Sequence, residues 1–157
     1  MKNPVERLVE RLIHGDSQKA ALVFSEKNRF YFTQFPASDG ALLVTAEEAY
    51  LLMDFRYEEA AHYKAKYCTV VGFDSLLGKL GELIQKHGIK QIYLETEQLS
   101  VAQARRFEAS FQKVGAEVVL DDTLDSAIRD QRMIKSPEEV KKIEASQEIT
   151  DAAFTHI

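Results

Sequence analysis

The best local candidate for a metal site is a group of acidic residues and one histidine between residues 54 and 62. Asp54, Glu58, Glu59 and His62 include two intervals of four residues, 54/58 and 58/62, which would place side chains on one face of a helix. A metallohydrolase needs three or more such ligands converging on an ion, with further groups that orient them. The same spacing is common on solvated charged helices, where Arg56 or Lys64 would pair with the carboxylates. We therefore favour a solvated helix face over a metal site.

Three aspartates near residue 121 have a simpler explanation in local structure. Asp121, Asp122 and Asp125 follow a predicted strand and precede a helical run over 124–130. An aspartate or Thr123 at this point would cap the helix and interact favourably with its dipole.

Neither the remaining histidines nor the single cysteine forms a catalytic constellation. His14 and His87 stand beside glycines at predicted helix ends, where an imidazole favours the terminal carbonyls, and His156 has no metal-binding companion nearby. Cys68 begins a predicted strand, so we expect a buried structural thiol rather than a nucleophile. One cysteine excludes an internal disulfide and a cysteine-rich zinc site, which indicates a reducing compartment such as the cytoplasm.

Composition and motifs exclude several other functions. The 157 residues carry a net charge of -5 with basic residues scattered among acidic ones, so we expect no nucleic-acid or anionic-membrane partner. No apolar run reaches membrane-spanning length, and no signal peptide is expected. The chain also lacks a Gly-rich phosphate loop, a G-x-S-x-G motif and an H-E-x-x-H motif.

Apolar periodicity predicts an α/β domain. The elements expected up to residue 53 are a helix over 5–13, strands over 20–24 and 28–33, a loop over 35–40 and a hairpin of strands 41–44 and 49–53. The elements expected after it are helices over 57–66, 76–84, 100–114 and 124–130 alternating with strands over 69–71, 91–94 and 117–120. Hairpin strands followed by strand–helix alternation favour a mixed sheet with helices packed against it.

A further helix begins at the sequence Ser136-Pro137-Glu138-Glu139. Ser136 and Glu139 have the spacing of a capping box, and Pro137 suits the first helical position. Its expected apolar side carries Val140, Ile143, Ile149, Ala152, Ala153 and Ile157. No glycine, proline or basic last turn follows, so the helix is expected to be interrupted by the end of the chain rather than to stop there.

Four segments of the chain stand in a family-specific order. They are NRFYFTQF (28–35), SDGALLV (38–44), DFRY (54–57) and IRDQRMIKSPEEV (128–140). The first three resemble the amino-terminal domain shared by creatinase, prolidase and aminopeptidase P. The fourth resembles the family's junction, a linker rich in arginine and lysine followed by the first helix of the catalytic domain.

This resemblance implies a ribonuclease H-like α/β domain over residues 1–130, with a mixed sheet flanked by helices. Residues 131–157 would be a linker and the start of the first helix of a pita-bread catalytic domain beyond this chain. In the family that domain holds two divalent ions, manganese, cobalt or zinc, on two Asp, one His and two Glu, and no position here matches those ligands. The family reaction is hydrolysis of the bond before proline by a metal-activated hydroxide, so this chain alone is expected to be inactive.

The resemblance also implies a homodimer in which this domain helps to wall the neighbouring subunit's active site. Loops there limit the length of the substrate, a dipeptide or short peptide that contains proline. The residues expected at this substrate entrance are Phe35, Ser38, Asp39 and Arg56. Arg56 could pair with a substrate carboxylate and Asp39 with a free amino group. Alternatively, Asp39-Gly40 is ordinary turn chemistry, and Arg56 could pair with Asp54 or Glu59.

Other interpretations stay open from the sequence. One is a stand-alone binding or dimerisation module, and another is a fragment of a creatinase-like amidinohydrolase. A metal-dependent nuclease rests only on the ribonuclease H likeness and would need inward carboxylates on central strands, which 20–24 does not offer. The short chain before the linker favours a dipeptidase over an aminopeptidase.

Overall fold

One mixed β-sheet forms the centre of the molecule in this computed structural model, which describes residues 2–156. Its six strands lie in the order β4-β3-β2-β1-β5-β6. Along the chain they are β1 (Lys19–Val23), β2 (Ala41–Val44), β3 (Ala49–Met53), β4 (Thr69–Gly72), β5 (Gln91–Leu94) and β6 (Glu117–Val119). β1, β2 and β3 pair antiparallel, whereas β5 with β1, β6 with β5 and β4 with β3 are parallel. The predicted fold class is confirmed.

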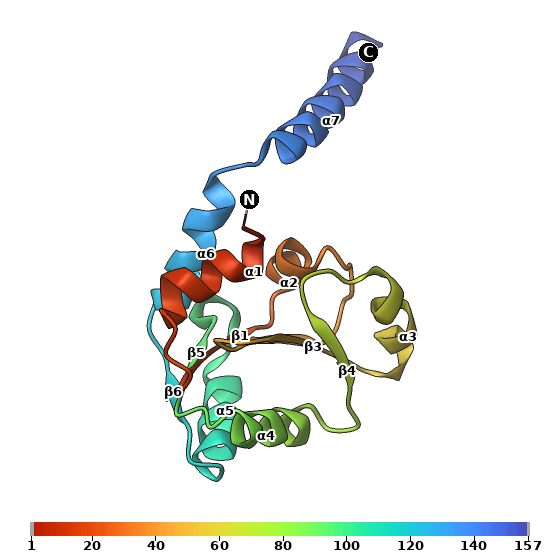
Figure 1. The fold of residues 1–157 in the computed structure, drawn as a ribbon. Helices are drawn as coiled ribbons and strands as arrows, with labels where there is room; N and C mark the ends of the chain where they lie inside the picture. The colour runs from red at the N-terminus through yellow and green to blue at the C-terminus, as the bar shows by residue number, and fades with distance from the viewer. Residues whose placement is uncertain (1, 157) are drawn as a thin grey trace.

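Helices cover both faces of this sheet (Figure 1). They are α1 (Pro4–Leu8), the π-helical turn η1 (Val9–Ile13), α2 (Glu26–Thr33), α3 (Phe55–Lys64), α4 (Leu76–Lys86), the 3-10 turn η2 (Thr96–Gln98), α5 (Val101–Gln112), α6 (Thr123–Met133) and α7 (Pro137–Thr155). α1, α2 and α6 lie over one face and α4 and α5 over the other, while α3 flanks the sheet beside β4 (Figure 1).

The two helical layers create two cores because successive strand residues point to opposite faces. On β1, Leu22 packs with the α4–α5 side and Val23 with the α1–α2–α6 side. β2 alternates in the same way at Leu42 and Leu43. Apolar runs without polar alternation, as predicted for residues 20–24 and 41–44, therefore mark strands that are buried on both faces.

The predicted strand over 28–33 is wrong, because these residues form the helix α2. Ser25 caps this helix by accepting a hydrogen bond from the Asn28 amide at 3.2 Å. The helix ends at Gln34, whose φ of 56° is left-handed. Aromatic residues favour strands in general, but Phe32 is fully buried at helical spacing, so tertiary packing overrode that preference.

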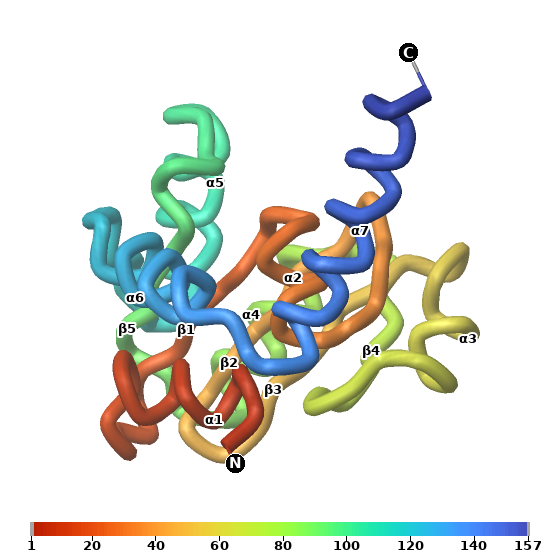
Figure 2. Tube along the Cα trace, turned by 90° about the horizontal axis from the view of Figure 1, so that it is seen from above, coloured from red at the N-terminus to blue at the C-terminus, as the bar shows by residue number. Residues whose placement is uncertain are grey.

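Helix α7 begins as predicted, but its side chains stay at the surface. Ser136 and Glu139 form the complete capping box. None of the helix's residues is buried: Val140, Ile143 and Ile149 are 40%, 53% and 73% exposed. Figures 1 and 2 both show α7 extending away from the α/β unit. Ile157, predicted on its apolar side, lies outside the described residues.

Candidate functional site

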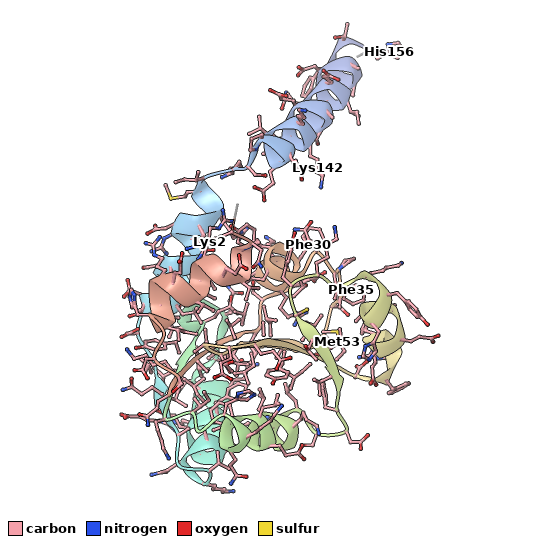
Figure 3. The ribbon with its side chains drawn as sticks, viewed as in Figure 1. Lys2, Phe30, Phe35, Met53, Lys142 and His156 are labelled. Atoms are coloured by element: carbon pink, nitrogen blue, oxygen red, sulfur yellow. The ribbon has the colours of Figure 1, made fainter. Side chains whose placement is uncertain are left out.

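The predicted substrate entrance combines residues 35–40, here called the entrance loop, with the first turn of α3. Phe35 and Ala37 of the loop are 5% and 6% exposed and belong to the core, whereas Ser38 and Asp39 face solvent. Phe35 and Met53 lie on the side of the molecule next to α3 (Figure 3). Inward apolar anchors thus hold a loop whose polar residues point outward.

Gly40 fixes the end of the entrance loop against β3. Its φ is +115°, and a Cβ atom there would lie 2.1 Å from Met53 Cε and 2.6 Å from the Leu52 carbonyl oxygen. No other residue fits this conformation and this space. The Gly40 amide also donates to Asp39 Oδ1 at 2.7 Å, which orients that carboxylate.

The loop meets α3 through two polar contacts. Asp54 caps α3 by accepting a hydrogen bond from the Arg56 amide at 2.9 Å. Arg56 Nε donates to Asp54 Oδ2 at 2.9 Å, and its Nη2 contacts both Asp54 and, at 3.4 Å, Asp39 Oδ2. The hydroxyls of Ser38 and Tyr57 lie 2.8 Å apart. Three predicted entrance residues, Ser38, Asp39 and Arg56, therefore come together.

The charges at this site favour a positively charged ligand group. The hydrogen bond from Arg56 lowers the pKa of Asp54, and the same bond raises the pKa of Arg56. Two carboxylates therefore face one guanidinium, which leaves about one negative charge at the loop. Arg56 already donates two hydrogen bonds to Asp54. The Asp39 carboxylate is therefore better placed than Arg56 to bind a charged group of a ligand.

Phe35 takes a different role from the other three predicted entrance residues. Its ring lies in the core with Met53 rather than on the open surface. It anchors the loop and does not face a ligand in this conformation.

The acidic candidates are engaged in local contacts. Asp54 caps α3, and Glu58 lies 3.8 Å from His62 within the same helix. Among residues 2–156, no three His, Cys, Asp or Glu side chains are grouped so that they could hold a metal ion. Of the second cluster, Asp121 accepts from the Thr123 amide at 2.9 Å, but the N-cap residue of α6 is Asp122, whose side chain makes no capping hydrogen bond.

Two sequence interpretations are corrected here. Asp125 does not cap α6; it is 7% exposed and accepts hydrogen bonds from the Thr96 amide and hydroxyl at 2.7 and 2.8 Å. The His87 ring does not bind helix carbonyls, since its Nε2 lies 2.7 Å from the Tyr50 hydroxyl. Both side chains join elements that lie far apart in the sequence, which local patterns do not reveal.

The prediction of a buried Cys68 thiol is met in part. It is half-buried just before β4, and burial raises its pKa to about 12. A thiol with this pKa carries almost no thiolate at neutral pH, so it is no nucleophile.

Two buried charged residues were missed, and one of them, Arg29, contacts the entrance loop. Arg29 is 4% exposed and Glu95 is fully buried. Glu95 accepts from the amides of Phe24 and Ser25, the latter at 2.8 Å, and from Asn28 Nδ2 at 2.5 Å. A charged residue directly after the apolar strand β5 was the available signal for Glu95, but the wrong secondary structure over 28–33 concealed its partners.

Comparison with known proteins decides the family. The model of the Creatinase/Prolidase N-terminal domain matches residues 5–134. The chain belongs to this family. A curated relative, the uncharacterized peptidase YqhT of Bacillus subtilis, is 30% identical over 137 residues, which are 87% of this chain and 37% of that protein. The chain therefore spans little more than a third of the length of this relative.

Solved structures agree with this creatinase/prolidase assignment. An X-Pro aminopeptidase from Thermotoga maritima matches with a TM-score of 0.82 and 26% identity over 99% of this chain and 43% of that one. A Xaa-Pro dipeptidase from Bacillus anthracis shares the fold with a TM-score of 0.85 and 24% identity, over 97% of this chain and 41% of that one. The chain is an N-terminal domain of the Xaa-Pro peptidase family. Within residues 2–156, no helix has the length and apolar character needed to cross a membrane.

Proposed function

We propose that this chain is the amino-terminal, non-catalytic domain of a longer Xaa-Pro dipeptidase that cleaves the bond before proline. Residues 1–130 would form the α/β domain, and 131–157 the linker and first helix of a following catalytic domain. The observation that carries the proposal is α7, a helix of 19 residues with a complete N-terminal capping box and no buried side chain. Its exposed apolar residues Val140, Ile143, Ile149 and Phe154 would pack against the following catalytic domain.

The metal chemistry of such an enzyme would belong to the following domain. This chain's donors do not fit a two-metal centre, since residues 2–156 contain no suitable group of three ligands. Two divalent ions, manganese, cobalt or zinc, would therefore be held outside this chain. A cytoplasmic location stays a prediction.

The entrance loop would act across a homodimer. Ser38, Asp39 and Arg56 are exposed together, and α3 presents Phe55 next to Arg56 and Tyr63 about two turns further along, at 85% and 84% exposure. Exposed aromatic residues beside charged ones are suited to contact a second subunit. The net negative charge at the loop would attract the free amino group of a short proline-containing peptide in the partner's active site.

Substitution of Asp39 in the longer polypeptide tests this role. Asp39→Asn should raise KM for a Xaa-Pro dipeptide about two- to fivefold, the range of one exposed charge pair, with kcat unchanged. Asp16→Asn is the matched control, because Asp16 is exposed and pairs with Lys19 at 3.8 Å. It precedes the first residue of β1, whereas the entrance loop lies near the last. Equal effects of the two variants would contradict a specific role for Asp39.

Two mass measurements test the assembly. An antibody raised against this chain should detect a native species more than twice 17.8 kDa in the source cells. Light scattering of that polypeptide should give the mass of two subunits. A native species of 17.8 kDa would instead support a stand-alone binding module.

A further inference from the structure

Arg29 holds the entrance loop from inside the protein. Its Nη1 donates to the carbonyl of Phe24 at 2.8 Å and to the carbonyl of Gly40, and its Nη2 donates to the carbonyl of Ala37 at 2.6 Å. The residue is 4% exposed, and this burial lowers the pKa of the guanidinium. A buried cation whose hydrogen-bond acceptors are backbone carbonyls serves to organise that backbone.

The three carbonyls come from separate parts of the chain. Phe24 follows β1, Ala37 lies in the middle of the loop and Gly40 leads into β2. One planar guanidinium can donate to three acceptors in a fixed geometry. A lysine ammonium is a compact point charge, so at this position it would not reach all three carbonyls. Arg29 therefore ties the middle and the end of the entrance loop to the segment that follows β1.

Two of these carbonyls bracket the exposed residues of the entrance. Ser38 and Asp39 are the only residues between Ala37 and Gly40. Fixing the backbone on either side fixes where the Asp39 carboxylate can lie, 3.4 Å from Arg56. We propose that Arg29 is a positioning residue that sets the place of Ser38 and Asp39 and thereby the substrate length that the entrance admits. This inference rests on the proposed function of the loop.

The first test uses the 157-residue chain and the endoprotease Asp-N, which cleaves before aspartate. Cleavage between Ser38 and Asp39, followed by mass spectrometry of the fragment 1–38, should be at least about tenfold faster in Arg29→Lys and Arg29→Met, because the loop opens locally. The matched control is Ile92→Val, a core change on the α4–α5 side of the sheet. It should reduce overall stability yet leave cleavage at this bond at the wild-type rate. Equal cleavage in all variants would overturn the inference.

The second test uses the longer polypeptide and compares a Xaa-Pro dipeptide with a Xaa-Pro-Yaa tripeptide. Arg29→Lys should change the ratio of the two kcat/KM values in the same direction as Asp39→Asn, whereas Ile92→Val should leave the ratio unchanged. A purely structural Arg29 would lower active protein without moving the ratio, which would overturn its role in substrate length. If Arg29→Lys opens the loop but neither it nor Asp39→Asn moves the ratio, the proposed function of the loop fails, while the hold of Arg29 on the loop stands.

Discussion

Helices α5 and α7 both begin with a capping box, but only α5 packs against the sheet. Ser100 and Gln103 form a capping box at α5, and Ser136 and Glu139 form one at α7. α5 buries Phe107 and Phe111 against the sheet, while α7 buries nothing. Capping decides where a helix starts, but the packing of an apolar face decides how much the helix contributes to stability.

The largest expected difference is between two apolar truncations. Phe111→Ala should lower the free energy of unfolding by about 3–5 kcal/mol, because Phe111 is fully buried and its loss leaves a cavity. Ile143→Ala should change it by less than about 0.5 kcal/mol, because Ile143 is 53% exposed. Urea denaturation of the 157-residue chain measures both. A comparable loss in Ile143→Ala would show that α7 packs on the domain in solution, contrary to the structure.

A buried and an exposed carboxylate should also differ in how much they contribute to stability. Glu95→Gln should cost about 1–3 kcal/mol, because an amide group replaces one of the carboxylate oxygens that accept hydrogen bonds from two backbone amides and Asn28. Glu97→Gln, two residues away, removes only an exposed pair with Arg129 and should cost less than about 1 kcal/mol. Thermal denaturation at pH 7 compares them. Equal losses would mean that the Glu95 network adds nothing to stability.

The two caps should differ in what their removal disturbs. Ser100→Ala should lower the global free energy of unfolding by about 1 kcal/mol, because α5 folds with the core. Ser136→Ala removes the same hydrogen bond but should only speed amide exchange within residues 137–155. Urea denaturation and hydrogen exchange separate these outcomes. A global loss of equal size in Ser136→Ala would place α7 in the cooperative unit.

Local signals in the sequence predicted much of this architecture. The buried strands, the hairpin over 41–53 and the cap at Ser136 are encoded by runs and spacings of neighbouring residues. The helix α2 was missed because its aromatic residues resemble a strand and its stability comes from tertiary contacts.

The candidate site shows the same limit. The motifs SDG and DFR indicated Ser38, Asp39 and Arg56, and their side chains do meet. The contacts of the buried residues Arg29 and Glu95 were not predicted, because their hydrogen bonds join segments that only the fold brings together. Phe35 was predicted at the entrance with these residues, and its burial was not predicted because burial within a loop does not follow the period of a helix or strand.

The smallest expected effect is at the exposed ion pair of the entrance. Arg56 holds the pKa of Asp54 below its ordinary value of 3.8. A lowered carboxyl pKa contributes stability above pH 3.8, and that contribution is lost as the pH falls through the folded value. Because both groups are exposed, Arg56→Ala should scarcely change stability at pH 7.

The pKa itself should respond. In Arg56→Ala the pKa of Asp54, followed by NMR of its carboxyl carbon, should rise toward 3.8. Asp121 provides the internal control, since hydrogen bonds from Thr123 lower its pKa without any contribution from Arg56. If only the Asp54 pKa rises, Arg56 pairs with Asp54 in solution as it does in the structure. Asp39 then remains as the charge available to a ligand. An unchanged Asp54 pKa would mean that Arg56 does not pair with Asp54 in solution. The guanidinium would then be available to a substrate carboxylate.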